Sequence, residues 1–189
     1  MVRRLVVAAL AAVCASTAVP AEAKAPVKLY LNQAGSCGSG PAWVITTIPD
    51  DSGGCVYVPR EQVNGEGLPS ENEAFATTKK TKAYTIDGTK ALTGTFALFG
   101  SSGLTLAEGP AMVAADFTVK VAKKKVGVVH VEGLALPTMP VTQAFSLKLP
   151  SGLNRVKTNS VQVQVNWITC VGLCGVAVSG TSFLSLPVR

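Results

Sequence analysis

The chain contains a single histidine, His130, and it stands two residues before Glu132. Residues two apart on a strand share one face, so the Glu132 carboxylate could orient the His130 imidazole as a general base. An exposed histidine beside a glutamate on a wet sheet face gives the same pattern. The sequence has neither a Gly-x-Ser-x-Gly elbow nor a Ser-x-x-Lys motif to supply a nucleophile. We therefore expect no catalytic residues and a protein that is not an enzyme.

The acidic residues offer the alternative to that expectation. A secreted carbohydrate-active hydrolase needs two carboxylates that the fold brings to either side of a glycosidic bond. The spacing of carboxylates along one chain does not say which of them meet. The candidates after the first 23 residues are Asp50, Asp51, Glu61, Glu66, Glu71, Glu73, Asp87, Glu108, Asp116 and Glu132.

Two lysine clusters give the chain a basic bias, with a formal net charge of +6 over 189 residues. They are candidate binding sites for cell-wall glycan or another anionic polymer, although two solvated turns would look the same. Nucleic acid is not expected, because aromatic residues are 6% of the chain and none is interleaved with the lysines. The clusters comprise Lys79, Lys80 and Lys82, and Lys123, Lys124 and Lys125.

A row of amide side chains alternates with valines between residues 161 and 167. Gln162, Gln164 and Asn166 would lie on one face of a strand, where amides can hydrogen-bond sugar hydroxyls. Trp167 falls on the opposite face, which favours a place in the core. Sugar-binding surfaces usually add aromatic rings for stacking. The candidates are Trp43, Tyr57 and Tyr84.

Residues 1–23 have the three parts of a secretory signal peptide. Arg3 and Arg4 supply the positive charge, a nine-residue apolar run covers Leu5 to Val13, and Ala21-Glu22-Ala23 is a small-x-small cleavage site. We expect cleavage after Ala23 and a secreted product of 166 residues with a charge of +5. No later stretch of the sequence is long and apolar enough to cross a bilayer.

Two other types of signal peptide fit residues 1–23 less well. A lipoprotein signal ending at Cys14 would need a small residue where Val13 stands. A twin-arginine signal would need a polar residue before the Arg3-Arg4 pair. Ordinary secretion fits both positions better.

The four remaining cysteines predict two disulfides in an oxidising compartment. Proximity favours Cys37–Cys55 and Cys170–Cys174 among the three possible connectivities. A zinc site is disfavoured, because Cys37 and Cys55 are too far apart to form a zinc knuckle. A redox motif is disfavoured because three residues, not two, separate Cys170 from Cys174. We expect no metal and no cofactor.

The sequence predicts β-strands for almost all of the elements that must position these candidate residues. Period-2 alternation recurs and helical periodicity is rare, which predicts an all-β fold with about ten short strands. We expect a single domain over 24–189, an antiparallel β-sandwich of the Ig-like or jelly-roll kind. The predicted strands are Val27–Leu31, Trp43–Ile48, Cys55–Val58, Ala83–Ile86, Leu92–Phe99, Phe117–Val121, Val126–Val131, Phe145–Leu149, Val161–Trp167 and Val176–Leu186.

Three connections stand out. Asp87-Gly88 is the strongest hairpin signal in the chain, and Lys123 to Lys125 are expected to turn between two strands. Residues 60–82 are polar and are expected to form a long surface loop, with at most one helical turn near Glu71–Phe75. Together these features predict an exported, non-catalytic binding module or surface and extracellular structural component.

Overall fold

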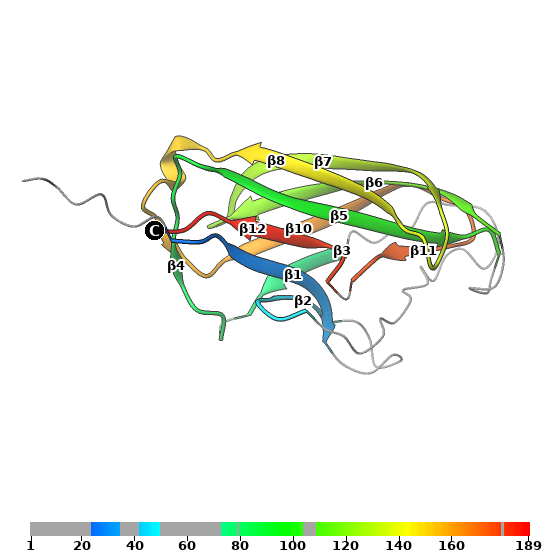
Figure 1. The fold of residues 1–189 in the computed structure, drawn as a ribbon, viewed down its shortest axis with the longest axis horizontal. Helices are drawn as coiled ribbons and strands as arrows, with labels where there is room; N and C mark the ends of the chain where they lie inside the picture. The colour runs from blue at the N-terminus through cyan, green and yellow to red at the C-terminus, as the bar shows by residue number, and fades with distance from the viewer. Residues whose placement is uncertain (1–23, 35–41, 50–72, 79, 104–108, 179) are drawn as a thin grey trace, which may run out of the picture.

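The computed structural model describes residues 24–34, 42–49, 73–78, 80–103, 109–178 and 180–189. The all-β prediction is confirmed, since no α-helix occurs among these residues and their one helical element is the 3-10 turn η2 (Ser151–Leu153). The strands, drawn in Figure 1, are β1 (Val27–Ala34), β2 (Ala42–Thr46), β3 (Glu73–Thr77), β4 (Tyr84–Thr85), β5 (Ala91–Ser101), β6 (Ala111–Val121), β7 (Lys124–Ala135), β8 (Val141–Lys148), β9 (Lys157–Thr158), β10 (Val161–Cys170), β11 (Leu173–Val176) and β12 (Phe183–Leu186).

Ten of these strands form one sheet in the order β11-β5-β12-β1-β2-β3-β10-β6-β7, with β8 paired to β5. The strands β4 and β9 form a separate two-stranded ribbon. The expectation of a purely antiparallel arrangement is wrong at one pairing, because β2 and β3 run parallel. Parallel neighbours need a crossover of about a dozen residues or more, and residues 47–72 provide that length. The sheet is therefore mixed.

The sheet curls so that β5 and β8 pack over β6 and β7 (Figure 1). The ring of Phe96 on β5 stacks on Phe117 of β6 at 4.4 Å and on Phe145 of β8 at 4.6 Å between centroids. Gly127 and Gly133 on β7 leave room for the β8 side chains, since a Cβ at Gly127 would lie 2.8 Å from Leu147. Aromatic stacking therefore joins β5 and β8 to β6, and the glycines of β7 allow β8 to pack closely against β7.

The amphipathic alternation predicted for residues 161–167 is confirmed. Val161, Val163, Val165 and Trp167 on β10 are buried, and the polar residues between them are half-exposed. Each buried aliphatic side chain of this kind stabilises the fold by about 1.5–3 kcal/mol. Valine favours strands because its branched side chain packs well on a pleated surface.

The loop predicted over residues 60–82 is wrong at residues 73–77, which form β3. Phe75 is fully buried and lies opposite Val163 of β10. Residues 74 and 76 are alanines, whose small side chains hide the alternation that marks a strand. This segment is a strand because it pairs with β10 and β2, and these tertiary contacts outweigh its weak local strand pattern. No helical turn occurs at residues 73–75.

The single strand predicted over Val176–Leu186 is also wrong. It is interrupted between β11 and β12, where Gly180 has a positive φ of 85°. The buried hydroxyl of Ser182 accepts a hydrogen bond of 3.1 Å from the Ala97 amide, so this turn is fixed against β5. Both flanking strands nevertheless pair with β5.

Asp87-Gly88 forms a turn but not a hairpin. The strands on either side of it do not pair with each other, since β4 pairs with β9 and β5 pairs with β8, β11 and β12. The Asp87 carboxylate accepts hydrogen bonds from Thr89, which closes the turn without a strand partner. In contrast, the predicted turn between the paired strands β6 and β7 is present, but it lies at Ala122 and Lys123. The prediction is wrong for Lys124 and Lys125, which belong to β7.

Several sequence predictions lie outside the described residues. These are the signal peptide at 1–23, the Cys37–Cys55 bridge, the strand at Cys55–Val58 and the part of the polar loop from residue 60 to 72.

Candidate functional site

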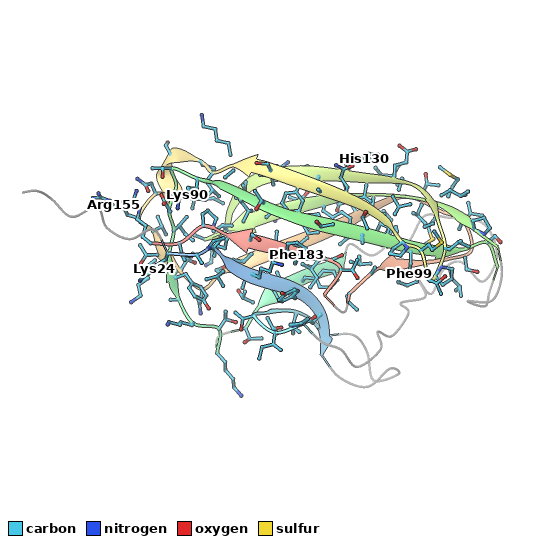
Figure 2. The ribbon with its side chains drawn as sticks, in the orientation of Figure 1. Lys24, Lys90, Phe99, His130, Arg155 and Phe183 are labelled. Carbon is cyan, nitrogen blue, oxygen red and sulfur yellow. A yellow bond between two sulfur atoms is a disulfide. The ribbon has the colours of Figure 1, made fainter. Side chains whose placement is uncertain are left out.

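Exposed cations gather at one end of the molecule, and we call this set the basic pole. Figure 2 shows Lys24, Lys90 and Arg155 at this end, close to the start of β1 and the start of β5. Every member is exposed. The basic pole comprises Lys24, Lys90, Lys123, Lys124, Lys125, Lys148, Arg155, Lys157 and Arg189.

Backbone pairing brings distant segments together at this pole. The Arg155 amide donates to the Ile86 carbonyl at 2.9 Å, and the Arg189 amide donates to the Thr85 carbonyl at 3.0 Å. Lys157 on β9 lies opposite Thr85 on β4. The Lys124 ammonium donates to the Gly152 carbonyl at 3.3 Å, so the β6–β7 turn lies against η2. Cations from three separate parts of the chain therefore share one end.

Asp87 carries the salt bridges at the basic pole among the described residues. Its carboxylate lies 3.3 Å from Arg189 Nη2 and 3.7 Å from Lys90 Nζ. A hydrogen bond of 2.6 Å from the Thr89 hydroxyl, helped by the charge of Arg189, holds the pKa of Asp87 below its ordinary value. The described carboxylates Asp116 and Glu132 lie further along β6 and β7, so positive charge dominates here.

The turn that contains Lys80 and Lys82 lies next to the β6–β7 turn, which contains Lys123. Asn159 donates through Nδ2 to the Thr81 carbonyl at 3.3 Å, between Lys80 and Lys82. The following residue, Ser160, accepts a bond of 2.8 Å from the Ala122 amide at the β6–β7 turn. The two predicted clusters, about 40 positions apart in the sequence, are thus joined through Asn159 and Ser160. Lys79 lies outside the described residues.

His130 lies between two carboxylates on the outer face of β6 and β7. Its Nδ1 is 2.8 Å from Asp116 Oδ1, and its Nε2 is 3.3 Å from Glu132 Oε2. The hydrogen bond to Asp116, followed by that to Glu132, raises the pKa of His130 above its ordinary value. The pairing with Glu132 agrees with the sequence prediction. Asp116 was missed because it lies on the neighbouring strand, where only the register of β6 with β7 reveals it.

The amide row of β10 lies in register with β6. Gln162 is opposite Lys120, Gln164 opposite Thr118, and Asn166 opposite Asp116. All three amide residues are half-exposed, so their side chains are open to the outer face.

The predicted aromatic partners do not join this row in the described part of the structure. Tyr84 is half-buried against the core. The side chain of Trp43 and the whole of Tyr57 lie outside the described residues. Trp167 is 8% exposed and belongs to the core, as expected.

A different aromatic pair lies on the sheet surface and was missed in the sequence. Tyr30 on β1 and Phe183 on β12 are register partners with ring centroids 6.1 Å apart. Lys28 places its ammonium 4.5 Å from the Phe183 ring centre, a cation–π contact. The alternation of residues 27–31 could have placed Tyr30 and Lys28 on the face opposite Leu29 and Leu31, but not beside Phe183.

The Cys170–Cys174 disulfide is present, with Cα atoms 5.9 Å apart. It links the end of β10 to β11 across a tight turn at Gly172, where φ is +84°. Among the described residues, no three His, Cys, Asp or Glu side chains are arranged to hold a metal ion. Within the same residues, no helix has the length and apolar character needed to cross a membrane.

Comparison with known proteins finds no matching family model, no matching curated protein and no matching solved structure. A functional assignment must therefore come from the surface itself.

Proposed function

We propose that the protein is an exported, non-catalytic binding module of the β-sandwich kind that holds an anionic polymer at its basic pole. The observation that carries this proposal is the convergence, on one end of the sheet, of the exposed cations that make up the basic pole, with the turn of Lys80 and Lys82 next to them. The ligand class follows from charge, because a surface of one sign attracts and concentrates a polymer of the other. A cell-wall glycan with acidic groups is one such polymer.

Export rests on the signal-like sequence of residues 1–23, which predicts cleavage after Ala23. The Cys170–Cys174 bridge supports it, because disulfides persist in oxidising compartments. The curl of β5 and β8 over β6 and β7 supports a two-layered, sandwich-like body that carries the pole at one end.

The basic pole would act through many weak contacts. A single exposed ion pair contributes about 0–1 kcal/mol, but a polymer can contact several lysines at once, and the second contact then becomes intramolecular. Exposed charges are also screened by salt, over about 8 Å at physiological ionic strength. Binding should therefore be multivalent and salt-sensitive.

Retention on immobilised polyphosphate and polygalacturonate, eluted with a salt gradient, tests the proposal. Lys148→Glu changes a cation of the basic pole on β8, and the double variant Lys123→Glu with Lys124→Glu changes the β6–β7 turn. The double variant Thr142→Glu with Gln143→Glu is the matched control, because it makes the same net charge change as Lys148→Glu at two exposed positions near the start of β8, away from the pole. We expect the pole variants to elute at clearly lower salt than the control. A wild-type protein that both columns fail to retain, or equal shifts for Lys148→Glu and for the Thr142→Glu with Gln143→Glu control, would overturn the proposal.

A carbohydrate-active hydrolase is the second candidate, and one observation favours it. Asp116 and Glu132 lie at opposite ends of the same imidazole, so two carboxylates do meet across strands. Both are open to solvent, with side chains 38% and 59% exposed, whereas a glycosidase acid usually needs a desolvated setting. Release of reducing ends from wall polysaccharide that disappears in both Asp116→Asn and Glu132→Gln would establish this activity in place of the first.

A further inference from the structure

We propose that the outer face of β1, β12, β5 and β8 is a binding track for an acidic polysaccharide, with sugar rings packed on Tyr30 and Phe183. This inference rests on the proposed function and narrows its ligand to a polymer that has both sugar rings and carboxylates.

The register of four strands places polar side chains in a row beside the basic pole. Lys28 is opposite Ser185, Ser185 is opposite Thr93, and Thr93 is opposite Ser146. These residues share the outer face, because the alternate positions Leu29, Leu184 and Leu92 are buried in the core. Adjacent strands lie about 4.8 Å apart, so the row spans roughly 14 Å. That length suits an extended oligosaccharide.

The next row, one step further from the pole, contains the aromatic pair. Tyr30 is opposite Phe183, Phe183 is opposite Thr95, and Thr95 is opposite Ala144. Both rings are half-exposed and tilted by 51° to each other. Rings in this position offer an apolar surface edged by hydroxyl groups, which matches the mixture of C–H and O–H groups on a sugar.

The two rows continue directly from the basic pole. Lys148 lies opposite Ala91 next to Lys90, and Ser146 stands two residues before Lys148 on the same face. Lys28 is likewise four positions from Lys24. Figure 2 shows Lys24 and Lys90 at the pole and Phe183 further along the body. A chain held by its charges at the pole can therefore extend over the hydroxyl row to the rings.

The chemistry of the track separates an acidic polysaccharide from other anionic polymers. Serine and threonine hydroxyls both donate and accept hydrogen bonds, as sugar hydroxyls require. Lys28, 4.5 Å from the centre of the Phe183 ring, places positive charge where a sugar carboxylate would lie. Polyphosphate has neither rings nor hydroxyl groups, so it can use the pole but not the track.

The test compares the affinities of wild-type and variant protein for polygalacturonate, polyphosphate and single-stranded DNA. Tyr30→Ala and Phe183→Ala should weaken polygalacturonate binding roughly three- to tenfold, the range expected for loss of an aromatic contact. Their polyphosphate binding should stay unchanged. Leu134→Ala is the matched control, because it removes an exposed apolar side chain, 61% exposed, from β7. Thr93→Val, which alters an exposed hydroxyl in the first row, gives a second variant if an aromatic variant fails to fold.

The outcomes separate this inference from the proposed function. Binding of polyphosphate without polygalacturonate would overturn the track and leave the basic pole standing. Failure to bind either polymer would overturn the proposed function itself. Unchanged polygalacturonate affinity in folded Tyr30→Ala and Phe183→Ala, with Thr93→Val also unchanged, would refute the track. A loss of DNA affinity alone in the aromatic variants would assign the rings to base stacking and reject the polysaccharide.

Discussion

Asp116 and His130 face each other across β6 and β7, with Asp116 Oδ1 2.8 Å from His130 Nδ1. When the imidazole is protonated, its Nδ1–H donates to this carboxylate and its Nε2–H can donate to Glu132. The arrangement stabilises the charged ring from both sides. It gives the sheet surface, away from the basic pole, a group whose pKa is raised above its ordinary value.

Substitution of Asp116 should lower the pKa of His130. Asp116→Asn removes the hydrogen bond that raises this pKa most, and Glu132→Gln removes the weaker one. We expect the imidazole resonances of wild type, followed by NMR, to titrate above pH 6.5, with a larger downward change in Asp116→Asn than in Glu132→Gln. The reverse order of the two variants would contradict the geometry.

His130 should also make the stability of the folded protein fall as the pH rises. A pKa that is raised in the folded state gives stability that is fully present below the unfolded value of 6.5 and is lost as the pH rises through the folded value. Urea unfolding of wild type should therefore show a small fall in stability across that window. His130→Gln should remove this fall while other titrations remain.

Asp87 predicts the opposite dependence in acid. Its pKa is lowered in the folded protein, mainly by the Thr89 hydroxyl. The stability it contributes is present above 3.8 and is lost as the pH falls through the folded value. In thermal unfolding between neutral pH and strong acid, Asp87→Asn should be less stable at neutral pH and should lose less stability on acidification. Parallel curves for the two proteins would refute this role.

Phe96 should be the most sensitive aromatic position in the core. It is fully buried and stacks on both Phe117 and Phe145, which joins the two faces of the curled sheet. Phe96→Ala should lower the free energy of unfolding by about 3–5 kcal/mol. Chemical denaturation measures this, with Leu134→Ala as a surface control that should change stability by less than about 0.5 kcal/mol.

The Cys170–Cys174 bridge should be oxidised in the purified protein and should add modest stability. Its loop is short, so the chain-entropy model gives roughly 2 kcal/mol. Peptide mapping before and after reduction should recover Cys170 and Cys174 in one disulfide-linked fragment. The double variant Cys170→Ser with Cys174→Ser should unfold at lower denaturant than wild type. Free thiols at both positions before reduction would contradict the pairing.

The sequence patterns predicted strands well where large apolar residues alternate with polar ones. The valines of β10 and the β6–β7 hairpin around Lys123 are examples, because burial there follows directly from side-chain type. The sequence does not predict β3, because Ala74 and Ala76 are apolar like Phe75 and so give no alternation of apolar and polar residues. Its partner strands also come from distant segments of the chain. The hairpin predicted at Asp87-Gly88 is wrong for a different reason. The side chain of Asp87 stabilises the turn, but the flanking strands do not pair with each other.

The candidate site was predictable as residue types but not as neighbours. Lys80 and Lys124 are recognisable as members of charged turns, yet only Asn159 and Ser160 bring their two turns together. The pairing of His130 with Glu132 follows from spacing along one strand. Contacts across strands, such as that between Tyr30 and Phe183, depend on register, which no local pattern in this chain specifies.

The pairing of β1 with β12 has a consequence for how the molecule acquires its structure. The first strand lies between β12 and β2, and β12 begins only at Phe183. Residues 27–30 of β1 therefore cannot form their hydrogen bonds with β12 until residues 183–186 have been synthesised. Contacts so far apart in sequence slow folding, because the entropy of closing the intervening chain is lost before the contacts form. Folding should thus be slow, with an unpaired β1 edge as the vulnerable intermediate.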